Sequence, residues 1–167
     1  MGAIDELVYL LDEAFRGRGI EETNESQSLL ANLTTVDEAS WRSIPPGGTR
    51  TIESIVLHVG SCRVMYDEYA FGAARLRWDD SGFPPWSEGE APRVEAIAWL
   101  TGAHETLIDH VRTLQDEDLA RPRPANWGEQ RETRWLISTL LEHDTYHAGE
   151  INHIRALLLS DDSWKWG

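Results

Sequence analysis

The sequence has a single cysteine, Cys62, and no long apolar run. One cysteine cannot form a disulfide within the chain, and the first residues lack the basic and apolar regions of a secretory signal peptide. His58, Glu105 and His143 interrupt the most apolar stretches, so none reaches the roughly 20 residues that a transmembrane helix needs. These absences predict a cytoplasmic protein with no membrane partner.

Basic residues are also scarce. The chain has 15 Lys and Arg against 29 Asp and Glu, which gives a formal net charge of −14 at pH 7. This charge repels nucleic-acid phosphates, so we expect no nucleic-acid partner. The 167 residues, 41% of them hydrophobic, suffice for one sizeable core, and we interpret residues 1–167 as a single domain.

Apolar residues recur at steps of three and four, the pattern of helices that bury one face, whereas strict two-residue alternation is rare. The pattern predicts an all-α chain with four principal helices. The first helix is expected to be broken, with apolar stretches over 4–15 and 29–33 and Asn24 as the candidate N-cap of its second part.

The other three helices have clearer boundaries. After a turn at 45–48, Thr51 is the expected cap of a helix that extends to about Gly72, and Pro92 suits the first turn of a helix that ends near Asp116. The longest periodic run extends from about Glu132 to Leu159. The connections are long enough to cross a helix bundle, but the sequence does not determine the order of the helices.

Two histidines interrupt the apolar stripe of the last predicted helix. The stripe consists of Leu136, Leu140, His143, His147, Ile151, Ile154 and Leu158. Four residues apart, His143 and His147 lie about 6 Å apart along the axis, so both rings can reach one cation. Two buried imidazoles otherwise need hydrogen-bonding partners. The pair therefore indicates either a metal site or two hydrogen-bonded core residues.

A hydrolytic or Lewis-acid metal site usually has three protein ligands and one open position. His58 and His104 both lie on apolar stripes, and periodicity does not decide between them as the third ligand. His110 and His153 lie on more polar arcs, so we interpret both as structural or surface residues.

The segment His143-Asp-Thr-Tyr-His147-Ala-Gly-Glu150, read with Thr51-Ile-Glu-Ser-Ile-Val-Leu-His58, resembles the DinB-like superfamily, which includes YfiT-type metal-dependent hydrolases. The resemblance spans the chain and implies a four-helix bundle with a long crossover connection, commonly as a homodimer. It also implies one divalent ion, zinc or nickel, bound by His58, His143 and His147. The resemblance thus favours His58 over His104.

Three neutral imidazoles leave a bound ion its full charge, which favours ionisation of a coordinated water. We therefore expect a hydrolase with a small-molecule substrate. Glu150, where many family members have Gln, lies one turn beyond His147 and is the candidate catalytic acid or base. Asp144 follows the first ligand, as Glu does in the His-Glu-x-x-His proteases, but it is one carbon shorter, and a protease is not favoured. Tyr146 and Tyr66 are weaker candidates as oxyanion donors, because packing is the commoner role of such residues.

Two other functions fit the same residues. A thiol-dependent S-transferase or isomerase would place a low-molecular-weight thiol on the ion, and Cys62, four residues past His58, is expected to face the same space. A non-catalytic metal or interaction module would need a fourth protein ligand, which Cys62, Glu150 or His104 would supply. Aromatic residues between the helices either cover the core or line a pocket mouth or dimer interface, namely Trp78, Phe83, Trp86 and Trp127.

Overall fold

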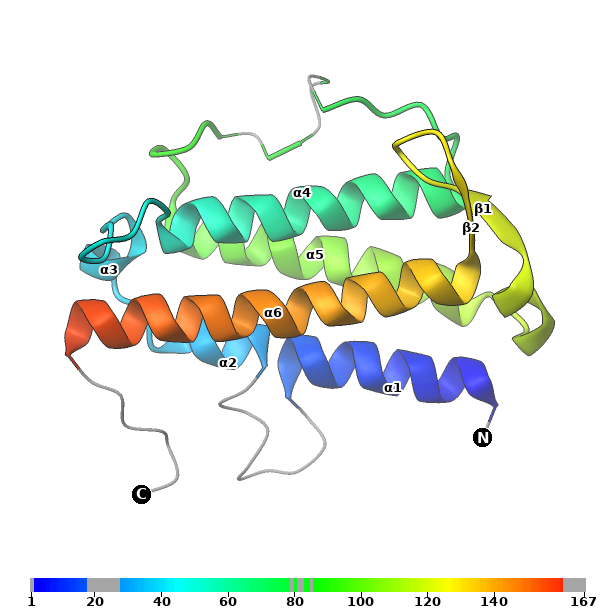
Figure 1. Ribbon diagram of the computed structural model, residues 1–167, viewed down its shortest axis with the longest axis horizontal. Helices are drawn as coiled ribbons and strands as arrows, with labels where there is room; N and C mark the ends of the chain where they lie inside the picture. The colour runs from blue at the N-terminus through cyan, green and yellow to red at the C-terminus, as the bar shows by residue number, and fades with distance from the viewer. Residues whose placement is uncertain (1, 18–27, 79, 81–82, 85, 161–167) are drawn as a thin grey trace.

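The computed structural model describes residues 2–17, 28–78, 80, 83–84 and 86–160. The elements in this part of the chain are α1 (Ala3–Arg16), α2 (Leu29–Thr34), α3 (Glu38–Trp41), α4 (Ile52–Phe71), α5 (Arg93–Arg112), the 3-10 helix η1 (Asp116–Ala120), β1 (Pro122–Pro124), β2 (Gln130–Glu132) and α6 (Thr133–Leu159). Figure 1 shows the long helices α1, α4, α5 and α6 extending along the length of the molecule. The predicted all-α class is confirmed, apart from the short hairpin of β1 and β2.

Local capping explains where several helices begin. The hydroxyl of Thr51 accepts a hydrogen bond from the backbone N–H of Ser54 at 3.0 Å, so Thr51 caps α4 as the sequence predicts. Ser28 caps α2 in the same way, whereas the predicted cap Asn24 lies outside the described residues. Pro92 directly precedes α5 and so occupies the N-cap position rather than the first turn.

The end of α5 differs from the prediction. α5 ends at Arg112, and Asp116 instead begins η1. The Asp116 carboxylate accepts hydrogen bonds from the backbone N–H groups of Ala3 at 3.0 Å and Ile4 at 3.1 Å. These N–H groups have no partner within α1, so Asp116 caps α1 from a distant part of the chain.

The long helices pack in a fixed pattern. α1 packs mainly against α5 and α6, and α4 packs against the same two helices. α4 and α5 run in one direction, whereas α1 and α6 run in the other (Figure 1). The chain between Phe71 and Arg93 therefore returns along the molecule before α5 begins.

A two-stranded hairpin precedes α6 and was not predicted. β1 and β2 are antiparallel, with Pro122 opposite Glu132 and Pro124 opposite Gln130. Proline donates no ladder hydrogen bond, so the two prolines indicated a break in the chain rather than a strand. The hairpin contacts α4 and leads directly into α6.

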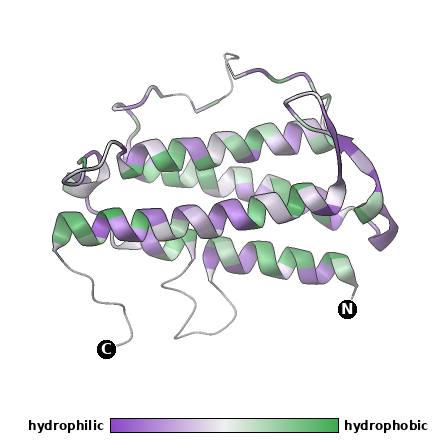
Figure 2. Cartoon of the chain, viewed as in Figure 1, coloured by the Kyte–Doolittle hydropathy of each residue, from purple (hydrophilic) through white to green (hydrophobic). Residues whose placement is uncertain are grey.

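The buried apolar residues form two main clusters along the helices. One includes Phe15, Trp41, Ile52, Leu100 and Ile151, and the other includes Leu11, Leu107, Val111, Ile137 and Leu140. Figure 2 shows hydrophobic and hydrophilic residues interspersed along each long helix, as expected for helices that bury one face. Of the helices in the described ranges, none has the length and apolar character needed to cross a bilayer.

Candidate metal centre

α4 and α6 position the three histidines of the site. His58 lies in the second turn of α4 and is exposed, whereas His143 and His147 lie one turn apart in the middle of α6. His147 is almost fully buried, with 3% of its surface exposed, and His143 is half-buried. Because α4 and α6 pack against each other, residues 85 positions apart come together.

The three rings point their Nε2 atoms toward one another. The Nε2 atom of His143 lies 3.2 Å from that of His58 and 3.2 Å from that of His147. One ligand atom from each of the three rings lies within 4.8 Å of the other two. Nitrogens bound to one tetrahedral zinc ion at about 2.1 Å lie about 3.4 Å apart. The spacing in this cluster therefore fits ligands of a shared divalent ion.

The histidines are held in the neutral form that binds metals. Burial, reinforced by the neighbouring His147, lowers the pKa of His143 to about 3. Burial also lowers the pKa values of His58 and His147, although the Glu150 carboxylate opposes the shift in His147. Near neutral pH the converging nitrogens thus offer lone pairs that need a cation or a proton between them.

Glu150 forms a hydrogen bond with the His147 nitrogen that points away from the cluster. Its Oε2 atom accepts a hydrogen bond from Nδ1 of His147 at 2.7 Å, and its two oxygens lie 3.2 and 3.3 Å from Nη1 of Arg50. With the proton on Nδ1, the Nε2 lone pair of His147 is directed at the other two histidines. A carboxylate on the second nitrogen is the usual partner of a metal-binding histidine. Glu150 therefore lies behind His147 rather than among the converging nitrogens.

Arg50 is a residue of this site that the sequence analysis missed. It directly precedes the N-cap Thr51, in a segment that shows no helical periodicity. Its guanidinium lowers the pKa values of the three histidines as a lesser cause after burial. A basic residue next to the start of the His58 helix was the available signal, but only the fold brings it to Glu150.

Cys62 lies beside the cluster but outside it. Its Sγ atom is 3.7 Å from Nδ1 of His58, and it does not belong to the group of converging ligand atoms. Burial raises the pKa of the Cys62 thiol to about 11, so the thiol is protonated near neutral pH. Tyr146 is 68% exposed and sets the edge of its ring against His147, with 4.9 Å between the ring centroids.

His104, the alternative third ligand, lies elsewhere in the core. Its ring stacks on Phe15 at 3.9 Å, and its Nε2 atom is 3.2 Å from Oδ1 of Asp12. Its Nδ1 atom contacts the guanidinium of Arg63, which can only donate, so this nitrogen accepts the hydrogen bond. The second nitrogen of the Arg63 fork donates to Asp144.

These contacts form a buried polar layer, which we define as Asp12, Arg63, His104 and Asp144. Each of the long helices α1, α4, α5 and α6 contributes one member. Asp144 thus faces Arg63 rather than the histidine cluster. The other two histidines also lie apart, because His110 pairs with Asp67 at 2.7 Å and His153 is exposed.

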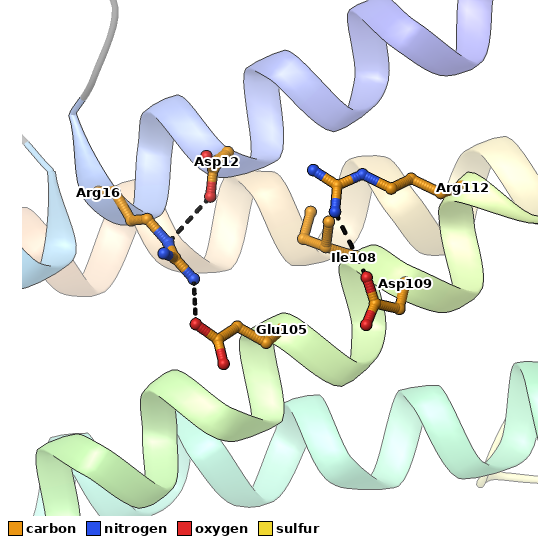
Figure 3. Close-up of a pocket in the computed structure, with 6 residues that line it drawn as sticks. All are labelled: Asp12, Arg16, Glu105, Ile108, Asp109 and Arg112. Atoms are coloured by element: carbon orange, nitrogen blue, oxygen red, sulfur yellow. Dashed lines mark hydrogen bonds and ion pairs between the residues drawn. The ribbon is translucent and has the colours of Figure 1, made fainter.

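A hollow lies between α1 and α5, away from the histidine cluster. It has a volume of about 290 Å³ and is lined by Asp12, Arg16, Glu105, Ile108, Asp109 and Arg112. Figure 3 shows the Arg16 guanidinium between Asp12 and Glu105, at 3.0 Å from each, and Arg112 against Asp109 at 3.3 Å. Its charged groups already satisfy one another, so the hollow is interpreted as an ion-paired helix contact.

Comparison with known proteins adds one match. A model of the DinB superfamily matches residues 21–151, which is more than three quarters of the chain. The matched range contains α2 to α5 and the part of α6 that carries both of its site histidines. No curated protein matches the sequence.

Proposed function

The chain belongs to the DinB superfamily, and from this membership we propose that it is a metal-dependent hydrolase whose divalent ion is held by His58, His143 and His147. We also propose that α1, α4, α5 and α6 form the four-helix bundle of this superfamily, with the chain between α4 and α5 as its long crossover. The observation that carries the proposal is the convergence of three neutral Nε2 atoms at a spacing that suits one ion.

The described residues support an open site rather than a closed structural one. Each of the three proposed fourth ligands lies outside the converging group: Cys62 is beside His58, Glu150 is behind His147, and His104 is bound in the polar layer. An ion held by three histidines keeps a position for water or substrate. Such an ion lowers the pKa of a coordinated water and polarises a substrate carbonyl.

The protein residues around the ion have separate roles in this proposal. Glu150 keeps the proton on Nδ1 of His147, and Arg50 holds the Glu150 carboxylate in place. We therefore assign Glu150 to positioning rather than to proton transfer with the substrate. His58 is exposed, so we propose that a small molecule approaches the ion from the side of His58.

Metal analysis of the purified protein tests the metal site. The wild-type chain is expected to hold one equivalent of zinc or nickel, and the His58→Ala variant is expected to lose it. His153→Ala is the matched control, because His153 lies on the same helix as His143 and is exposed outside the cluster. Stoichiometric metal retained by His58→Ala would overturn the ligand assignment.

Activity assays of the metal-loaded protein test the reaction type. Turnover of an ester such as p-nitrophenyl acetate without added thiol, lost in His58→Ala, is the expected result. Consumption of both a thiol and 1-chloro-2,4-dinitrobenzene, with no ester turnover, would identify thiol transfer instead.

The homodimer, the cytoplasmic location and the identity of the ion stay predictions.

A further inference from the structure

A second hollow lies on the same stripe of α4 as His58. It has a volume of about 480 Å³ and is lined by Met65, Tyr69, Leu76, Arg77, Trp78 and Asn126. This volume is within the range of pockets that bind small molecules. We call it the Trp78 cavity.

The helix register connects this cavity to the metal centre. Met65 follows His58 by seven residues, which is nearly two full turns, so both residues point to the same side of α4 about 10 Å apart along the axis. Cys62, which lies between them on this stripe, is small and only partly buried. The metal centre and the Trp78 cavity therefore lie on one side of α4.

The described residues that line the Trp78 cavity carry one positive charge and no negative charge. Met65, Leu76 and Trp78 supply an apolar wall, and the polar groups are a phenol, an amide and one guanidinium. Among the described residues that line it none is acidic, although acidic residues outnumber basic ones in the chain by 29 to 15.

The guanidinium of Arg77 is available to a ligand. Within the described ranges this guanidinium has no hydrogen-bond or ion-pair partner, since the bond to Asp80 is made by the backbone N–H of Arg77. This contrasts with the hollow between α1 and α5, where each guanidinium faces a carboxylate. A free guanidinium beside apolar side chains is suited to a carboxylate on an apolar body.

We propose that the Trp78 cavity binds the distal end of the substrate, and that the substrate is a small molecule with a carboxylate or similar anionic group at the end remote from the bond that reacts at the metal centre. The inference rests on the proposed function, because it assigns the cavity to the substrate of that site. Arg77 binds the anionic group, and Met65, Leu76 and Trp78 cover the apolar body.

Two hydroxamates test this arrangement on zinc-loaded protein. Suberic acid monohydroxamate carries a metal-binding hydroxamate and a carboxylate joined by six methylene groups, and octanohydroxamate has the same length without the carboxylate. Calorimetry gives the ratio of their affinities. Arg77→Gln is expected to lower the preference for the carboxylate by about tenfold or more, because a charge-assisted hydrogen bond is lost. Arg75→Gln, an exposed arginine outside the cavity lining, is the matched control and should retain the wild-type ratio.

The outcomes separate this inference from the proposed function. If both hydroxamates bind but Arg77→Gln leaves their ratio unchanged, or Arg75→Gln lowers it equally, the cavity inference is overturned and the metal site stands. A second arm compares 2-naphthoate with 2-naphthamide in metal-free protein. A naphthoate preference that Arg77→Gln abolishes supports the cavity even if neither hydroxamate binds, in which case the metal site fails. No naphthoate preference in the wild-type protein overturns the anionic assignment.

Discussion

Arg63 and Asp144 form an ion pair in the middle of the protein, with 1% and 0% of their side chains exposed. Asp144 directly follows the site residue His143, so this pair holds α6 against α4 at the level of the histidine cluster. Replacing Asp144 by Ala leaves the buried charge of Arg63 uncompensated. We expect the free energy of unfolding to fall by about 3–5 kcal/mol in a denaturant titration.

The control for Asp144→Ala is Asp109→Ala. Asp109 also pairs with an arginine, Arg112, but both side chains are more than half exposed. Surface pairs of this kind contribute about 0–1 kcal/mol. Equal losses in the two variants would show that the polar layer has no special role in stability.

A second prediction concerns the hydrogen bond between Glu150 and His147. Glu150→Ala removes the acceptor on Nδ1, and loss of such a partner typically lowers metal affinity by about 10–100-fold. Glu150→Gln keeps an acceptor and should recover part of the affinity. Competition titrations with a chromophoric chelator measure both values. Glu142→Gln, an exposed change on the same helix, should match the wild-type protein, and an unchanged affinity in Glu150→Ala would remove Glu150 from the site.

Two helical glycines are expected to respond oppositely to alanine. A Cβ at Gly60 of α4 would overlap the ring of Trp99, and such overpacking costs about 1–3 kcal/mol. A Cβ at the exposed Gly102 of α5 meets no atom within 4 Å, so Gly102→Ala should stabilise the protein by up to about 1 kcal/mol through helix propensity. Thermal unfolding of the two variants measures both changes. A stabilising Gly60→Ala would show that Trp99 moves aside freely.

The cap of α1 by Asp116 predicts a pH dependence. The hydrogen bonds from the N–H groups of Ala3 and Ile4 lower the pKa of Asp116 below its usual value of 3.8. A lowered pKa in the folded protein means that the charged form stabilises the fold above pH 3.8 and that this contribution is lost as the pH falls through the folded-state pKa. Asp116→Asn should therefore be less stable than wild type at pH 6, with a gap that narrows as the pH falls below 3.8 and toward the folded-state pKa. A gap independent of pH would contradict the role of the charge.

Local signals predicted much of the helical framework. Thr51 was identified as a cap because an N-cap acts on residues next to it, and the boundaries of α4 and α6 agree with the expected 51–72 and 132–159 within about a residue. The hairpin and the cap of α1 were missed, because Pro122 and Asp116 acquire their roles only through partners that lie elsewhere in the chain.

The candidate site, too, could be predicted from the sequence only in part. Helical spacing indicated that His143 and His147 act together, and it placed Glu150 on the same side of α6. Spacing does not say which ring nitrogen a neighbour faces, so the position of Glu150 behind His147 required the structure. Arg63 occupies a core position that the apolar pattern would give to an aliphatic residue, and its partners Asp144 and His104 lie on other helices.

The three histidines come from two helices, so the complete set of ligands forms only when the chain folds. The stability of the fold would therefore depend on the supply of the ion. An unfolded chain holds His58 and His143 at opposite ends of an 85-residue loop and offers no preformed chelate, so an ion would bind the native state almost exclusively. At a free concentration one hundred times its dissociation constant, such a ligand adds about 2.7 kcal/mol to the unfolding free energy. Scarcity of the ion would then reduce the amount of intact protein as well as its chemistry.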